Sequence, residues 1–113
     1  MTEENIRYIT NDDIPNIVEP CYITSEGELW QWSLRQNKMK RKSVFLDMNN
    51  NCAKVNIMLY DYDSKGRNTK SKTISVASLV YRFFKRVDLQ MENRLDIGHH
   101  DNDVMNCRLE NLY

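Results

Sequence analysis

The last eighteen residues of the chain, from Asp96 to Tyr113, hold both of its histidines, which are adjacent at His99 and His100. Three aspartates and three asparagines share this segment. A histidine titrates near neutral pH and can act as a general base, and carboxylate oxygens are the ligands that hard divalent cations prefer. Asn and Asp side chains also bond to their own backbone and so build tight loops. The segment therefore offers a base, oxygen ligands and loop-forming side chains in one place.

The histidine pair, taken alone, has a simple interpretation. Adjacent histidines at the end of a strand point to opposite faces, so only one of them can face a given site. Two ordinary loop histidines are the default for such a pair, and a zinc site is disfavoured because no cysteine or third histidine lies nearby. The alternative is a cation site beside His99, with candidate ligands Asp96, His100, Asp101 and Asp103.

Composition favours one small globular domain. The chain has 113 residues, of which 41% are hydrophobic. No apolar run approaches the length needed to cross a bilayer, and the first four residues lack the pattern of a signal peptide. The three cysteines, Cys21, Cys52 and Cys107, are odd in number and widely spaced, which predicts ordinary thiols in a reducing compartment. We therefore expect a soluble, cytoplasmic protein with no membrane partner.

The net charge of zero conceals an uneven distribution. Residues 1–28 carry seven acids and one Arg, residues 29–86 carry thirteen Lys or Arg and three acids, and residues 87–113 carry six acids and two Arg. A basic middle segment is typical of a face that contacts phosphates, although solubility alone produces the same pattern. The candidate phosphate contacts are Lys38, Lys40, Arg41, Lys42, Lys65, Arg67, Lys70, Lys72, Arg82, Lys85 and Arg86.

Hairpins are predicted to position these residues. Residues 21–24 and 29–32 flank a Gly turn and predict a hairpin, with Trp30 and Trp32 on one face. Core packing is the commoner explanation of such tryptophans, with base stacking or a partner contact as the alternative. Further along the chain we expect a basic loop at residues 35–42 and a short strand at 44–46. A second hairpin is expected from strands at 54–60 and 69–74, joined by a loop at 63–68.

One helix is predicted after the hairpins. An apolar stripe at helical spacing is formed by Val76, Leu79, Val80, Phe83 and Phe84. Ser75 is the expected N-cap, and Lys85 and Arg86 suit the C-terminal end of the helix dipole. The expected fold class is therefore α+β, a small antiparallel sheet of hairpins with one clamping helix. Residues 1–20 are expected to be an acidic lead-in arm that packs on the domain through Ile6, Tyr8, Ile9, Ile14 and Ile17.

The order of these elements and the C-terminal residues resemble the HNH endonucleases of phages and mobile introns, the homing type. In that family a strand ends in a His, an Asp-Gly-Asn loop follows, and then comes Asn-Asn-Arg-x-Glu-Asn-Leu. The matching run here is residues 99–112, which read His-His-Asp-Asn-Asp-Val-Met-Asn-Cys-Arg-Leu-Glu-Asn-Leu. Residues 22–30, Tyr-Ile-Thr-Ser-Glu-Gly-Glu-Leu-Trp, are similar to the opening of the DNA-binding module that often precedes such nuclease domains. The resemblance implies one domain over residues 21–113, with hairpins and helix to residue 86 and an HNH-like tail from 87 to 113.

The resemblance also implies a partial ββα-metal-like loop at the end of the chain and roles for single residues. His99 matches the general base that activates a water for attack on the scissile phosphate. The cation, Mg²⁺ or Mn²⁺, would stabilise the leaving oxygen. Asn111 matches the residue that braces the loop, and Asp101 and Asn106 match loop-forming positions.

The sequence departs from the family at its metal ligands. Gly98 stands where the family often has a metal-binding Asp, and the family's second ligand lies on a helix about two turns beyond the position of Leu112. The loop Gly is replaced by Asn102, the loop Asn by Asp103, and the second Asn of the pair by Cys107. Because two expected ligands are missing, the resemblance leaves catalytic activity open, with Mg²⁺ or Mn²⁺ needed if the chain is active and no cofactor otherwise.

Three functions are therefore considered. The first is a phage-type, HNH-endonuclease-like DNA-binding protein that is a weak or inactive nuclease in the cytoplasm of the host cell. The second is a protein-binding inhibitor or anti-defence protein built on a degenerate HNH scaffold, whose acidic ends meet a basic surface of a host protein. The third is a subunit whose missing ligands come from a second chain, and the sequence leaves the oligomeric state open.

Overall fold

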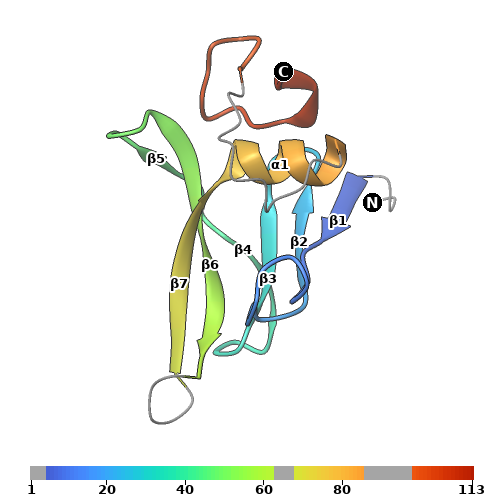
Figure 1. Ribbon diagram of the computed structural model, residues 1–113, viewed down its shortest axis with the longest axis vertical. Helices are drawn as coiled ribbons and strands as arrows, with labels where there is room; N and C mark the ends of the chain where they lie inside the picture. Colours follow the sequence, from blue (N-terminus) through green and yellow to red (C-terminus); the bar gives the residue numbers. More distant parts are fainter. Residues whose placement is uncertain (1–4, 63–67, 86–97) are drawn as a thin grey trace.

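The computed structural model describes residues 5–62, 68–85 and 98–113. It shows an α+β fold of two antiparallel sheets and one α-helix, which confirms the expected class (Figure 1). The candidate residues Lys65, Arg67, Arg86 and Asp96 lie outside the described residues, as do the acidic arm's first four residues.

The first sheet has four strands in the order β1-β2-β3-β4. These strands are β1 (Ile6–Tyr8), β2 (Cys21–Thr24), β3 (Leu29–Ser33) and β4 (Lys38–Arg41). The predicted hairpin at residues 21–32 is confirmed as β2 and β3. The prediction of a loop at residues 35–42 is wrong in part, because Lys38 to Arg41 pair with β3 as an edge strand. Lysine-rich edge strands have polar side chains on both faces, so the sequence carries little alternation that would reveal them.

The second sheet has three strands, β5 (Phe45–Asp47), β6 (Cys52–Asp61) and β7 (Asn68–Ser75), in that order. Val55, Ile57 and Leu59 alternate along β6, and all three are buried, as their spacing predicts. Strand β7 is an edge strand of this sheet, and its residues from Asn68 to Thr73 are exposed. The core lies between the two sheets and beneath the helix.

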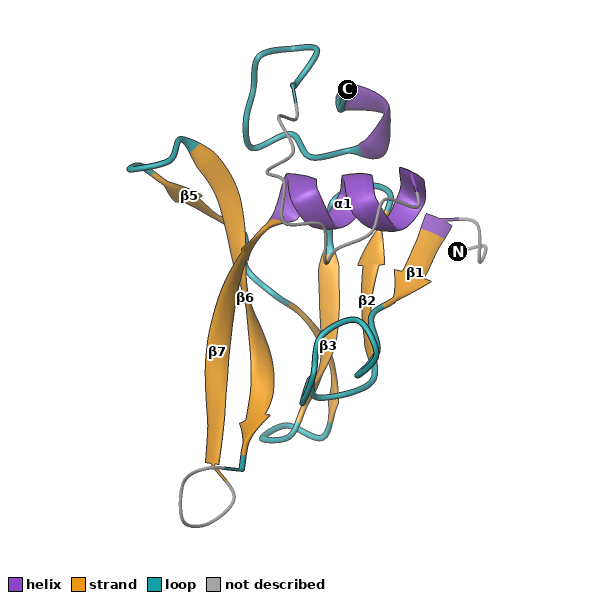
Figure 2. Cartoon of the chain, in the orientation of Figure 1, coloured by secondary structure: helices purple, strands orange, loops and turns teal. Residues whose placement is uncertain are grey.

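The helix α1 (Val76–Lys85) follows β7 directly and crosses the ends of both sheets, where it contacts β2, β6 and β7 (Figures 1 and 2). Leu79 and Val80 are fully buried, which confirms the predicted apolar stripe. The Ser78 N–H donates to the Ser75 hydroxyl at 3.3 Å, so Ser75 is the N-cap that the sequence predicts. Among the described residues, no helix is long and apolar enough to cross a membrane.

The first twenty residues take a larger part in the fold than a lead-in arm. Strand β1 extends the first sheet by pairing with β2. Ile9, Ile14 and Ile17 are buried in the core, as expected, and Val18 is buried with them. The backbone of this segment also bonds to the second sheet, because Val18 N–H donates to the Met58 carbonyl at 3.2 Å. Because four of its apolar side chains are buried, this segment packs as part of the core between the sheets.

One buried amide joins the two sheets. Gln31 of β3 is only 2% exposed, and its side-chain nitrogen donates to the carbonyls of Val18 at 3.0 Å and Met58 at 2.8 Å. Its side-chain oxygen accepts from the Met58 N–H at 2.9 Å. Both N–H donors of the amide and one lone pair of its oxygen are therefore used, so the amide is buried without an unpaired donor.

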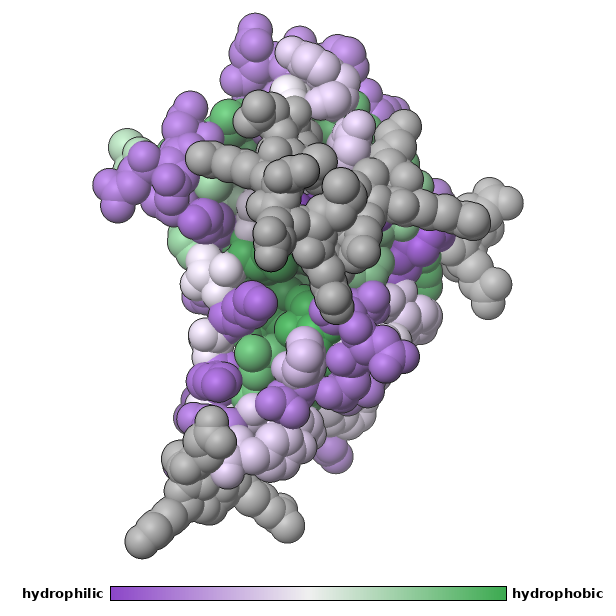
Figure 3. Space-filling view, viewed as in Figure 1, coloured by the Kyte–Doolittle hydropathy of each residue, from purple (hydrophilic) through white to green (hydrophobic). Residues whose placement is uncertain are grey.

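The space-filling view shows a hydrophobic band in the middle of one face, bordered by hydrophilic residues (Figure 3). The helix and the C-terminal residues lie at one end of the molecule, and the β6–β7 hairpin extends toward the other (Figure 1). The residues that suggested chemistry in the sequence are therefore gathered at the helical end.

Candidate functional site

The described part of the tail, residues 98–113, is a closed loop. Gly98 and Tyr113 exchange two backbone hydrogen bonds of 2.9 and 3.0 Å, and the His100 N–H donates to the Asn111 carbonyl at 2.8 Å. A short 3-10 helix, Leu109–Asn111, precedes this closure. The tail also binds the β2–β3 turn, because the Leu109 N–H donates to the Ser25 carbonyl at 2.7 Å. The loop is thus closed by backbone pairing between its two ends and attached to the β2–β3 turn through Leu109.

Three polar side chains form the interior bracing of this loop. The Asn111 amide nitrogen donates to Asp101 Oδ1 at 2.9 Å and to the Asn106 carbonyl at 2.8 Å. The Asn106 amide nitrogen donates to Asp101 Oδ2 at 2.7 Å, and Asp101 Oδ1 also accepts from the Asp103 N–H at 2.8 Å. Asn111 is only 7% exposed. These contacts agree with the loop-structuring roles that the sequence suggests for Asn106 and Asn111.

The bracing network holds Asp101 in its ionised form. The Asn106 amide, the Asp103 N–H and the Asn111 amide all donate to this carboxylate, and together they lower its pKa from 3.8 to about 2. A carboxylate that accepts several donors is stabilised in its charged state. Asp101 is therefore a structural acceptor with both oxygens engaged.

His99 lies at the edge of a pocket of about 790 Å³ between the tail, the start of α1 and the second sheet. Its backbone forms an antiparallel bridge with Leu112, and its side-chain Nε2 is buried without a hydrogen-bond partner among the described residues. Lys54 and Arg82 line the same pocket. Thr73, Ser75 and Ser78 add three hydroxyl groups, and no Asp or Glu is among the described residues that line it.

His100 and Asp103 face elsewhere. His100 is exposed, and its ring packs against the Tyr113 ring at a centroid distance of 4.6 Å. Asp103 is exposed and caps the loop, because its Oδ1 accepts the Met105 N–H at 3.0 Å. Of the pair of histidines, only His99 therefore lines the pocket, as the alternation of side chains along a strand predicts.

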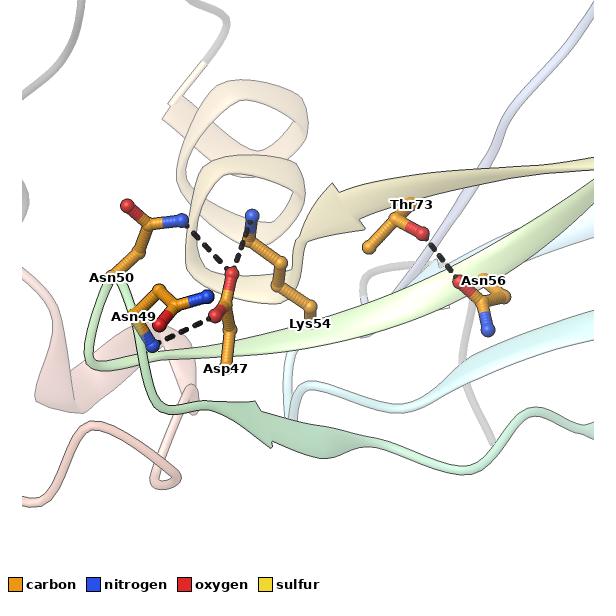
Figure 4. Close-up of polar contacts among 6 residues, drawn as sticks. All are labelled: Asp47, Asn49, Asn50, Lys54, Asn56 and Thr73. Atoms are coloured by element: carbon orange, nitrogen blue, oxygen red, sulfur yellow. Dashed lines mark hydrogen bonds and ion pairs between the residues drawn. The ribbon is translucent and has the colours of Figure 1, made fainter.

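The β5–β6 turn borders the pocket and orders one of its cations. Lys54 forms an ion pair with Asp47 at 2.9 Å, and the Asn50 amide nitrogen donates to the same carboxylate, also at 2.9 Å (Figure 4). Lys54, the Asn50 amide and the Asn49 N–H lower the pKa of Asp47 from 3.8 to about 2. Both charges of the pair are therefore retained at neutral pH, and Lys54 is held at the rim.

The absence of a carboxylate at Gly98 has a steric explanation. A Cβ atom built on Gly98 would lie 2.3 to 2.7 Å from three ring atoms of Tyr113. Real Cβ atoms do not approach carbon this closely, so any larger residue would displace the Tyr113 ring. In this chain the ring of Tyr113 takes the space next to the Gly98 backbone.

The described residues do not fit the magnesium site that the HNH resemblance implies. They contain no group of three or more His, Cys, Asp or Glu side chains that could hold a metal ion. Both oxygens of Asp101 accept hydrogen bonds, and the cations Lys54 and Arg82 line the pocket beside His99. A hard divalent cation requires several free oxygen ligands and is repelled by such neighbours. Asp96 lies outside the described residues.

Cys107 is buried in the core, and its thiol donates to the Val104 carbonyl at 3.5 Å. Burial raises the pKa of this thiol to about 11. The glycine of the β2–β3 turn, Gly27, has φ of +86° and approaches the Cys107 backbone so closely that a Cβ would lie 3.1 Å from its carbonyl oxygen. Cys107 therefore helps to pack the tail against the core and the β2–β3 turn.

The basic candidates fall into separate groups. Lys38, Lys40 and Arg41 lie on the edge strand β4 and are exposed, and Lys42 follows them. Lys70 and Lys72 are exposed on the other edge strand, β7, which continues into the pocket-lining residues at its end. Arg82 lies on α1, where it lines the pocket, and Lys85 ends the helix. The sequence did not reveal that Lys54 and three hydroxyl side chains would join His99, because their proximity depends on how β6, β7 and α1 pack.

Comparison with known proteins finds no match to a family model, a curated protein or a solved structure.

Proposed function

We propose that this chain is a DNA-binding protein on an HNH-like scaffold, in which the pocket beside His99 receives a backbone phosphate. The observation that carries the proposal is the composition of this pocket. Two cations, a histidine and four hydroxyl side chains line it, and the described lining residues include no Asp or Glu. Such a set of donors favours an anion over a cation.

The surroundings of the pocket support a phosphate ligand. Ser75 caps the N-terminus of α1 and Ser78 stands in its first turn, where the helix dipole is positive. His99 lines the pocket, and its buried Nε2 lacks a partner among the described residues. The pocket volume of about 790 Å³ exceeds that of one phosphate, which leaves room for the attached sugars.

Strand β7 extends this charge along the molecule. Lys70 and Lys72 are exposed and share one face of this edge strand, whereas Thr73 and Ser75, which line the pocket, point to the other face. A DNA backbone that crosses the open edge of β7 would come near both lysines and the pocket beside His99. The proposal therefore involves about three phosphates, one at each lysine and one in the pocket, and each neutralised phosphate contributes about 0.9 to the slope of binding against salt.

Fluorescence anisotropy with labelled duplex DNA tests the proposal. Three phosphate contacts should weaken binding about 40-fold between about 50 and 200 mM salt. Lys72→Gln should reduce the slope by about one unit, whereas Arg108→Gln, an exposed charge change on the tail, should leave it unchanged. Duplex affinity that does not respond to salt would overturn the proposal.

A plasmid-nicking assay with Mg²⁺ and Mn²⁺ separates binding from catalysis. Since the described residues do not fit a magnesium site, we expect no metal-dependent nicking. Nicking that disappears in His99→Ala would instead establish an enzyme of the HNH type. Failure to bind duplex DNA, combined with a host protein that stays bound after nuclease treatment of the lysate, would favour the inhibitor function.

A further inference from the structure

The outer face of the first sheet carries a row of aromatic side chains that neither the tail nor the pocket uses. Tyr8 pairs with Tyr22, Tyr22 with Trp30, and Trp30 with Arg41 in the register of β1, β2, β3 and β4. Each strand therefore contributes one residue to a single row, which we call the aromatic ladder. Directly paired residues on neighbouring strands point to the same face, so the whole ladder lies on one side of the sheet.

The ladder lies opposite the core. Side chains alternate along a strand, and the residues between ladder positions, Ile23 and Leu29 among them, are fully buried in the core. Strands β2 and β3 are thus apolar on both faces. A sheet with only one packed face usually carries polar residues on the other. The aromatic residues of the second face therefore require an explanation other than the core of this domain.

The rings of the ladder are ordered by contact with each other. Tyr8 and Tyr22 meet edge to face at 5.6 Å, and Tyr22 and Trp30 stack at 6.3 Å with planes 15° apart. The ladder is still open to a ligand, because Tyr8 is 57% exposed and Tyr22 and Trp30 are only partly buried. Trp32, opposite Met39, continues the same face by one more row. Rings that are ordered in advance lose little entropy when a flat ligand stacks on them.

Cations adjoin the ladder along one side. Strand β4 is an edge strand of the sheet, and Arg41 lies on the ladder face. The exposed Lys38 and Lys40 pair with Ser33 and Gln31, so they alternate to the opposite face and lie along the open edge. Arg41, the last member of the ladder, pairs with Glu28 at 3.0 Å, and its side chain remains 62% exposed. Stacking surfaces beside a line of positive charge are the two requirements for binding a single-stranded nucleic acid without sequence preference.

We infer that the outer face of the first sheet binds single-stranded DNA, with bases stacked on the aromatic ladder and phosphates on the cations of β4. The ladder face is composed of rings, the Met39 thioether and Arg41, and its nearby carboxylate, Glu28, is already paired with Arg41. The rings offer stacking surface to the bases. This surface is separate from the pocket beside His99, so the inference does not depend on the proposed duplex site.

The test compares two oligomers of equal length and charge. The first is oligothymidine about 12 nucleotides long, and the second has the same backbone with abasic sites in place of the bases. Both carry the same phosphates, so only stacking separates them. Anisotropy titrations of the whole chain should show oligothymidine binding at least tenfold more tightly. Equal affinity for the two oligomers would overturn the inference, and so would tighter binding of oligouridine RNA of that length.

A pair of tyrosine variants locates the site. Tyr8→Leu removes the most exposed ring of the ladder and should weaken oligothymidine binding about fivefold or more. Tyr62→Leu, at another tyrosine that is 73% exposed, should leave the affinity unchanged. Equal effects of the two changes would contradict the assignment. Duplex competitor should not displace oligothymidine, so loss of the duplex site alone leaves this inference standing.

Discussion

The tail and the outer face of the first sheet use their functional groups in opposite ways. In the tail, Asp101, Asn106 and Asn111 saturate one another with hydrogen bonds. On the outer face, the Tyr8 ring and the Arg41 side chain remain largely exposed. The tail has the residue types of an active site, whereas the outer face consists of ordinary strand residues. Residue type indicates which chemistry is available, and the number of unused contacts indicates where a ligand can bind.

This difference has a physical cause. A loop of sixteen described residues, with only a short 3-10 helix, has few backbone partners of its own. Its side chains must supply the hydrogen bonds that a sheet obtains from neighbouring strands. The strands of the first sheet satisfy their backbone through pairing. Their side chains are therefore free to interact with a partner.

The largest expected effect is that of Asn111→Ala. The buried Asn111 side chain makes three hydrogen bonds, two to Asp101 and one to the Asn106 carbonyl, and each contributes roughly 0.5–1.5 kcal/mol. We expect the free energy of unfolding to fall by about 2–4 kcal/mol in urea denaturation. Gln36→Ala, at an exposed position in the β3–β4 turn, should change it by less than about 0.5 kcal/mol. Equal effects would remove the contrast between tail and sheet surface.

Acid should weaken the tail through Asp101. Its pKa in the folded chain, about 2, lies below its ordinary value of 3.8, so the folded state binds fewer protons than the unfolded state in this range. The stabilisation is complete above about pH 4 and is lost as pH falls through about 2. Asp101→Asn should reduce the dependence of thermal stability on pH in that window, and Asp47, whose pKa is also about 2, should maintain the remainder. Glu110→Gln makes the same charge change at an exposed tail position and should keep the slope of the parent chain.

The smallest expected effect concerns the ion pair of the outer face. Glu28→Gln removes the partner of Arg41, and an exposed pair of this kind contributes at most about 1 kcal/mol, so thermal stability should hardly change. The released Arg41 should raise the affinity for oligothymidine by about two- to threefold at low salt. Glu26→Gln, in the same turn but exposed and outside the pair, is the matched control. A decrease in affinity would indicate that Glu28 itself contacts the ligand.

The elements with strong periodicity were predictable from sequence. Strand β6 shows alternation and α1 shows a helical stripe, and both signals come from burial on one face. Strands β1 and β4 were missed for different reasons. Tyr8 is exposed, which weakens the strand pattern of three residues, and the lysines of β4 resemble a solvated loop. Short edge strands carry too few buried side chains to produce a period.

The candidate site was predictable only in its loop. The resemblance implies loop-forming roles for Asp101, Asn106 and Asn111, and their contacts with each other are local in sequence. The pocket beside His99 draws Lys54 and Arg82 from distant elements. The aromatic ladder likewise depends on the register of four strands, and spacing along one strand does not determine which residue of the next strand lies opposite.

The Gln31 amide has a consequence for evolution of this chain. Its three hydrogen bonds reach two separate segments, so sliding one sheet past the other would break them together. A leucine of similar volume could fill the same space, yet it would accept several alignments of the sheets. The Gln31 amide therefore favours one alignment of the two sheets over the others. Mutations can accumulate on either outer surface without changing the distance between the pocket beside His99 and the aromatic ladder.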